Sequence, residues 1–249
     1  LKYFLLSLIF LVFCSYTRYY YATFWILYIY IIYKQFGFKI VIQQTLFSFI
    51  LSIPALIYFG YIFSNYNFLS LLENQSSFNF LKNIFQILSI LFFYILPFIL
   101  IDLKNFINFY KKQFKILIIT LFFVTLFIFI EGLHYKINLG GGVFYKLNYF
   151  LNLNYPIIIF LSVFFSVLSI IYFSESKIQN YILFICLIIS FSQNTIYQKY
   201  FDPLYLFLFF GLLKSRILDR NILQKKIPIV LVLLYFLFFL AFSLIYYNN

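Results

Sequence analysis

Long apolar runs separated by short polar segments recur along the whole chain. Several reach the roughly 18 nearly uncharged residues that a helix needs to cross a bilayer core about 30 Å thick. They are apolar on every face and longer than membrane-barrel strands, which have about 10 residues of alternating polarity. The pattern therefore predicts an all-α, polytopic transmembrane helix bundle of eight or nine spans, depending on the first run. The predicted spans lie near residues 1–14, 20–33, 40–63, 83–101, 114–130, 156–173, 179–193, 201–213 and 227–246.

Composition supports this class of protein. The 249 residues are 65% hydrophobic and 10% charged, against roughly 45–50% and about 25% in soluble domains. One transmembrane domain over residues 1–249 accounts for the pattern most simply. Leu1 lies within an apolar run and the sequence has no Met, so the chain is compatible with the C-terminal part of a longer protein.

The basic residues alternate from loop to loop between the predicted spans. Thirteen of the 18 lysines and arginines fall on one side of the predicted bundle, and the positive-inside rule makes that side cytoplasmic. The net charge of +12 is then a topological signal, and no nucleic-acid partner is expected. We expect a multi-pass integral membrane protein, in contact with membrane lipid, in a bacterial inner membrane with its basic loops cytoplasmic.

The predicted outer face holds the longest polar stretch of the second half, residues 131–154, EGLHYKINLGGGVFYKLNYFLNLN. Glu131 and His134 lie three residues apart and would share a face if the preceding helix continues. A carboxylate beside an imidazole can orient a general base. The alternatives are a surface ion pair and a hydrated loop. One histidine and two distant cysteines, Cys14 and Cys186, predict no metal site and no cofactor.

Three consecutive glycines, Gly140, Gly141 and Gly142, follow in the same stretch. They lack the frame of a nucleotide-binding motif. Glycines let the backbone turn tightly and expose N–H groups to a phosphate or a sugar. Lys136 and Lys146 are near enough in sequence to add positive charge. The pattern is consistent with a substrate-binding loop or with a flexible turn.

A second polar segment of the predicted outer face is residues 197–204, YQKYFDPL. Lys199 and Asp202 lie three residues apart among aromatic side chains at the mouth of a predicted span. The lysine suits an anionic headgroup and the aspartate suits a hydroxyl. The alternative is an interfacial anchor with an ion pair.

The run QKYFDPLYLFLFF resembles the late "R/K-Y/F-x-x-P-L" segment of the GT-C superfamily of polytopic glycosyltransferases, which take sugars from polyprenyl-phosphate donors. The resemblance covers about ten residues and the general architecture. It implies that Lys199 and Gln198 face the phosphate of the donor. The family's acidic residues lie in the first outer loop, whereas residues 15–19 here hold Arg18 and no carboxylate. Either those acidic residues precede Leu1 in a longer chain, or the resemblance does not extend to them; within this sequence, Glu131 and Asp202 are the candidate catalytic residues that would take their place.

Three functions are compatible with the sequence. The first is a membrane glycosyltransferase that uses a polyprenyl-phosphate-linked sugar at the extracytoplasmic face. The second is a transporter or flippase for a lipid-linked or small polar substrate, which would usually place ionisable groups within its spans. All six acidic residues fall at span ends or in loops, which disfavours ion-coupled transport. The third is a non-catalytic subunit of a membrane complex.

Overall fold

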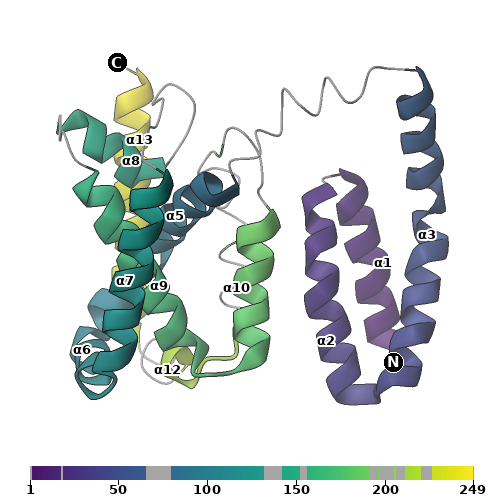
Figure 1. Ribbon diagram of the computed structural model, residues 1–249, viewed down its shortest axis with the longest axis horizontal. Helices are drawn as coiled ribbons and strands as arrows, with labels where there is room; N and C mark the ends of the chain where they lie inside the picture. The colour runs from purple at the N-terminus through teal and green to yellow at the C-terminus, as the bar shows by residue number, and fades with distance from the viewer. Residues whose placement is uncertain are drawn as a thin grey trace. The chain divides into compact units, whose positions relative to one another are not determined.

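A computed structural model describes most of the chain. It describes residues 2–17, 19–65, 80–131, 142–151, 156–190, 196, 205, 211–219 and 226–248. These residues form helices and, within the described ranges, no strand, which confirms the predicted all-α class (Figure 1). The elements are α1 (Lys2–Thr17), η1 (Tyr19–Phe24), α2 (Trp25–Phe36), α3 (Phe38–Asn65), α5 (Phe80–Ile101), α6 (Leu103–Lys112), α7 (Phe114–Glu131), α8 (Gly142–Phe150), α9 (Ile157–Ser174), α10 (Ile178–Ser190), α12 (Arg216–Leu218) and α13 (Lys226–Asn248).

Among the described residues, three helices are long and apolar enough to cross a membrane, and α6 with α7 would make a fourth span if the bent pair is counted as one. The three are Phe38–Ile62, Asn83–Ile101 and Ile157–Ser174. Shorter apolar helices cover three more of the predicted spans. The chain therefore has the helices of a membrane protein, while the count of eight or nine spans stays a prediction.

Contacts divide the chain into two compact units, each described here by itself. The first unit comprises Leu1–Ile84 and Ile178–Ile196, and the second comprises Phe85–Lys177 and Tyr197–Asn249. The prediction of one transmembrane domain over residues 1–249 stays a prediction.

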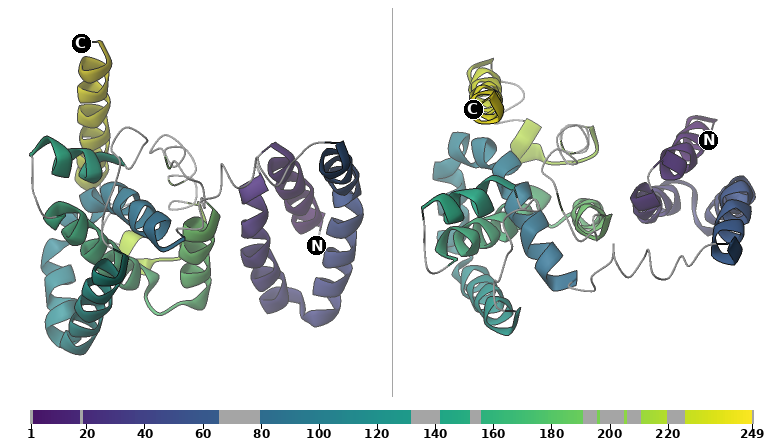
Figure 2. Two further views of the ribbon diagram at one scale, coloured as in Figure 1. Left: turned by 45° about the horizontal axis from the view of Figure 1, so that its top comes forward. Right: turned by 90° about the horizontal axis from the view of Figure 1, so that it is seen from above.

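In the first unit, α1, α2 and α3 run alongside one another and form a triangle when seen from above (Figure 2). Their shared core contains Leu8, Ile32 and Val41 around the ring of Tyr28. The Tyr28 hydroxyl lies 2.9 Å from the Phe4 carbonyl oxygen and 3.0 Å from Gln44 Oε1. A buried hydroxyl needs such a partner in an apolar interior, so Tyr28 ties α2 to both neighbouring helices.

Helix α10 joins the first unit through polar contacts with η1, which directly precedes α2. Ser190 Oγ lies 2.5 Å from Thr23 Oγ1 in η1. The thiol of Cys186, a buried residue, lies 3.3 Å from the Thr23 carbonyl oxygen. Cys186 is thus a small buried side chain, as expected for a cysteine within an apolar span.

In the second unit, α5 and α9 form the most buried helix pair. Ser162 Oγ on α9 lies 3.0 Å from Ser89 Oγ on α5. Both serines are almost fully buried, and small polar residues of this kind are common where membrane helices meet. Pro97 lies inside α5. A hydrogen bond between two neutral side chains therefore links α5 and α9 without burying a charge.

Candidate functional site

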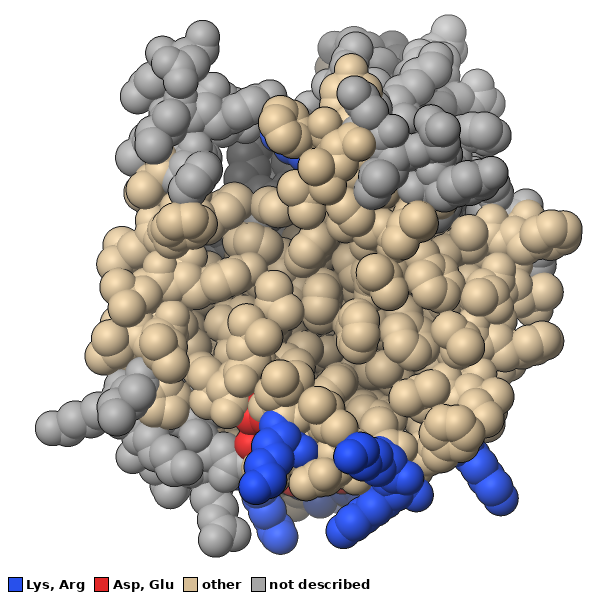
Figure 3. All heavy atoms as spheres, turned by 90° about the vertical axis from the view of Figure 1, so that its left-hand side faces the viewer, with Lys and Arg blue, Asp and Glu red and all other residues tan. Residues whose placement is uncertain are grey.

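The second unit has two chemically different ends. Exposed Lys and Arg side chains gather at one end of the face drawn in Figure 3. We call this the basic end. α6 and α12 lie there, whereas α8 lies at the opposite end of the unit (Figure 1). An 18-residue helix such as α7 is about 27 Å long, so Glu131 at its last turn is separated from the basic end by nearly the thickness of a bilayer core.

Three of the ten candidate site residues lie within the described part of the chain. Glu131 is the last residue of α7, Gly142 is the first residue of α8, and Lys146 is an exposed residue of α8. All three belong to the end of the second unit opposite the basic end. The others lie outside the described residues: His134, Lys136, Gly140, Gly141, Gln198, Lys199 and Asp202.

Gly142 has a structural reason to be glycine. Its φ of +76° lies in the region that side chains with a Cβ rarely adopt. The residue is buried at the start of α8. The last glycine of the triplet therefore sets the direction in which α8 leaves the preceding segment.

Helix α8 is fixed to the start of α9. Asn148 Oδ1 accepts a hydrogen bond of 3.3 Å from the backbone N–H of Ile158. The ring of Phe144 packs against Phe92 of α5 with centroids 5.3 Å apart. Lys146 is exposed on the opposite side of the helix.

At the basic end, a buried carboxylate connects three elements. Asp102 follows α5 directly and is 6% exposed. Its Oδ1 accepts a hydrogen bond from Asn105 Nδ2 on α6, and its Oδ2 accepts one from the hydroxyl of Tyr172 on α9, both at 2.6 Å. Hydrogen bonds to an ionised acceptor are the strong kind. With both oxygens occupied and little access to solvent, Asp102 is an anchor rather than a general base.

Aromatic side chains complete this anchor. The rings of Phe106 and Phe109 on α6 both contact Tyr172, with centroids 5.3 Å away. The hydroxyl of Tyr110, also on α6, donates to the carbonyl oxygen of Leu168 on α9. Helix α6 is therefore held along the end of α9 by its buried face.

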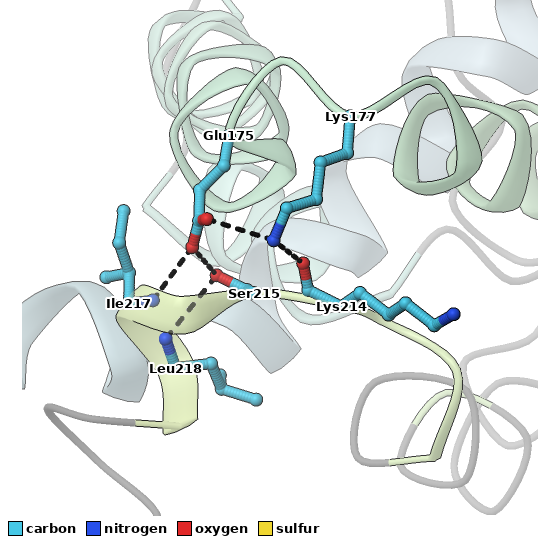
Figure 4. Close-up of polar contacts among 6 residues, drawn as sticks. All are labelled: Glu175, Lys177, Lys214, Ser215, Ile217 and Leu218. Atoms are coloured by element: carbon cyan, nitrogen blue, oxygen red, sulfur yellow. Dashed lines mark hydrogen bonds and ion pairs between the residues drawn. The ribbon is translucent and has the colours of Figure 1, made fainter.

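A second polar cluster of the basic end surrounds Glu175, the residue after α9 (Figure 4). Glu175 Oε1 accepts hydrogen bonds from Ser215 Oγ at 2.9 Å and from the Ile217 N–H at 2.8 Å. Glu175 Oε2 lies 3.1 Å from Lys177 Nζ. Lys177 also donates to the carbonyl oxygen of Lys214 at 2.6 Å. Together these contacts fasten residues 214–218 to the turn after α9.

The same contacts set the ionisation of Glu175. Burial opposes ionisation, but the N–H of Ile217, the hydroxyl of Ser215 and the ammonium of Lys177 outweigh it, so the pKa of Glu175 is below its ordinary value. A depressed pKa means that the stabilisation is present above the unfolded-state pKa of about 4.3 and is lost as the pH falls through the folded-state value.

We therefore expect Glu175→Gln to loosen residues 214–218 at neutral pH, because a charge-assisted hydrogen bond becomes a neutral one. Hydrogen exchange of the amides of Ile217 and Leu218 should be several-fold faster, equivalent to about 1 kcal/mol. Asp219→Asn, which neutralises an exposed carboxylate nearby, is the control. Equal exchange in Glu175→Gln and wild type would show that the cluster does not hold this segment.

Sequence reasoning placed Asp102 and Glu175 only as acids at span ends. Their partners lie far along the chain, 70 residues away for Tyr172 and 40 for Ser215. The local signal that could have indicated the anchor is Asp102 and Asn105 three residues apart at the start of a helix.

No family model matches the chain, and no significant match was found among curated proteins or solved structures. In the described ranges, no three His, Cys, Asp or Glu side chains gather as a metal site requires.

Proposed function

We propose that the chain is a polytopic membrane glycosyltransferase, or the C-terminal part of one, that transfers a sugar from a polyprenyl-phosphate donor. Its site would be the end of the second unit opposite the basic end, and the basic end would face the cytoplasm of a bacterium. In this proposal, the membrane is crossed by α1, α2, α3, α5, α7, α9, α10, α13 and the segment 201–213, which gives nine spans.

The observation that carries the proposal is that the lysines and the candidate site residues lie at opposite ends of the second unit. The lysines of α6 and the start of α7 lie at one end, while Glu131, Gly142 and Lys146 belong to the other. Cytoplasmic loops are enriched in Lys and Arg. This supports an extracytoplasmic position for the candidate site, the side on which GT-C enzymes use lipid-linked donors.

The proposed reaction needs a base and a cationic surface. The Glu131 carboxylate, or Asp202 in its place, would take the proton of an acceptor hydroxyl as the hydroxyl oxygen attacks the anomeric carbon. The bond from the anomeric carbon to the donor phosphate oxygen breaks, and the lipid phosphate leaves with the negative charge. Lys199 and Lys146 would stabilise that charge.

The positions of the described carboxylates favour transfer over ion-coupled transport. Asp102 and Glu175 lie after the ends of α5 and α9, and Asp219 follows α12. Transporters usually hold such groups near the middle of the membrane. In the described helices of the second unit, the interior polar groups of α5 and α9 are neutral serines and amides.

A non-catalytic subunit of a membrane complex is the second candidate, because one helix has a large uncovered apolar surface. Most side chains in the span Phe38–Ile62 of α3 are not buried within the chain. Phe49 and Ile57, for example, are 62% and 68% exposed. Such a surface packs against lipid or against a neighbouring transmembrane helix.

The test is sugar transfer in membranes that contain the full reading frame. Labelled sugar from a panel of polyprenyl-phosphate donors should appear in a product that membranes without the protein do not make. Absence of transfer across the panel by well-folded protein would contradict the proposal and favour the subunit function.

A further inference from the structure

Helix α6 presents a row of lysines that no acidic side chain of the described residues neutralises. Lys104, Lys111 and Lys112 on α6 and Lys115 at the start of α7 are exposed. Among the described residues, none of these four lysines forms an ion pair with a carboxylate; Glu175 pairs with Lys177, and Asp102 is buried against Asn105 and Tyr172. The lysines are therefore available to an external anion.

The direction of α6 suits a membrane surface. Leu103–Lys112 and Phe114–Phe129 meet at an angle of 93°, with a single residue, Gln113, between them. If α7 crosses the bilayer, α6 lies parallel to its surface. The anchor at Asp102 and the contacts of Tyr172 hold it in that direction.

The exposed side of α6 has an apolar edge and a basic edge, as helices that lie in a membrane interface do. Leu103 and Ile107 lie one turn apart on α6, are 43% and 44% exposed, and form its apolar edge. Phe114, the first residue of α7, follows this edge and is 60% exposed. At 100° per residue, Lys104 and Lys111 lie next to this edge, and Lys112 lies further round. Apolar side chains can then enter the acyl boundary while the adjacent ammonium groups remain at the depth of the phosphates.

From this arrangement we propose that α6 and Lys115 form a binding surface for anionic phospholipid headgroups. The lysines bind the lipid phosphates, and Leu103, Ile107 and Phe114 contact the upper part of the acyl chains. The surface holds the basic end of the second unit against one leaflet. This inference is independent of sugar transfer and stands if the proposed function fails.

The test measures binding of phosphatidylglycerol and of phosphatidylcholine to the purified full chain in a neutral detergent, by native mass spectrometry. We expect tighter binding of phosphatidylglycerol, weakened by salt. Each lysine near a membrane surface contributes about 1 kcal/mol, which converts to about five-fold. Lys111→Gln with Lys112→Gln should therefore reduce the preference by at least several-fold.

Two further double variants make the result specific. Lys34→Gln with Lys39→Gln removes the same charge from two exposed lysines of the first unit and should retain the preference. Lys111→Arg with Lys112→Arg keeps the charge and should also retain it. Equal binding of the two lipids by wild type, or an equal loss in both glutamine variants, would overturn the proposal, because neither outcome assigns the preference to α6.

Discussion

Replacing Glu131 with glutamine is expected to lower the rate of sugar transfer by about 10²- to 10⁴-fold, the usual contribution of a general base. Glutamine has nearly the same shape but cannot accept a proton from the acceptor hydroxyl. Transfer would be followed in membranes with the labelled donor that gives the highest wild-type activity. Lys199→Ala should also reduce transfer, because the leaving phosphate loses a cation that stabilises it.

Matched controls distinguish the loss of a catalytic or phosphate-binding side chain from a general loss of charge. Asp219→Asn removes a carboxylate, and Lys39→Ala removes a lysine, from exposed positions remote from the candidate residues in sequence. Both should transfer sugar as wild type does. If Glu131→Gln retains full activity while Asp202→Asn loses it, Asp202 is the base; if both retain activity, the proposed assignment of the base is wrong.

Replacing Tyr172 with phenylalanine is expected to lower the free energy of unfolding by about 1.5–3 kcal/mol. The substitution removes the donor to Asp102 Oδ2 and leaves a buried carboxylate oxygen without that hydrogen bond, which costs more than the loss of a neutral pair. Unfolding would be measured by far-UV circular dichroism during titration of mixed micelles with SDS.

Tyr149→Phe is the control for Tyr172→Phe. Tyr149 is 58% exposed. Removing its hydroxyl therefore leaves no buried hydrogen-bond partner behind. Its loss should change stability by less than about 0.5 kcal/mol. If both variants unfold at the same SDS fraction, the bond between Tyr172 and Asp102 does not hold α6 on α9.

The apolar runs of the sequence predict the helices well because length and continuous hydrophobicity are sufficient signals in a membrane protein. The span predicted near residues 156–173, for example, is the helix Ile157–Ser174, whose bounds differ by one residue at each end. The predicted span 20–33 differs, since it consists of a 3-10 turn over Tyr19–Phe24 followed by α2. Apolar composition alone does not distinguish these two kinds of helical turn.

Helix α6 shows a limit of the hydropathy signal. Residues 103–112 contain three lysines and two asparagines, so the run looks like a polar loop when only continuous hydrophobicity is considered. Phe106 and Tyr110 are one turn apart and form its buried stripe. This period of a surface helix is present in the sequence, but the right-angled join to α7 depends on tertiary contacts.

The candidate site could be predicted only in part. The sequence proposes candidate residues, of which Glu131, Gly142 and Lys146 belong to one end of the second unit. The distant partners, Tyr172 of Asp102 and Ser215 of Glu175, could not be predicted, because no local pattern relates residues 70 and 40 positions apart.

The central claim is that the basic end and the end with α8 lie on opposite sides of a membrane. Single cysteines at Asn108 on α6 and at Lys146 on α8, both exposed, would be introduced into a chain with Cys14 and Cys186 replaced. A membrane-impermeant thiol reagent should label Asn108→Cys only in inverted vesicles and Lys146→Cys only in right-side-out vesicles. Labelling of both positions from the same side would contradict the account.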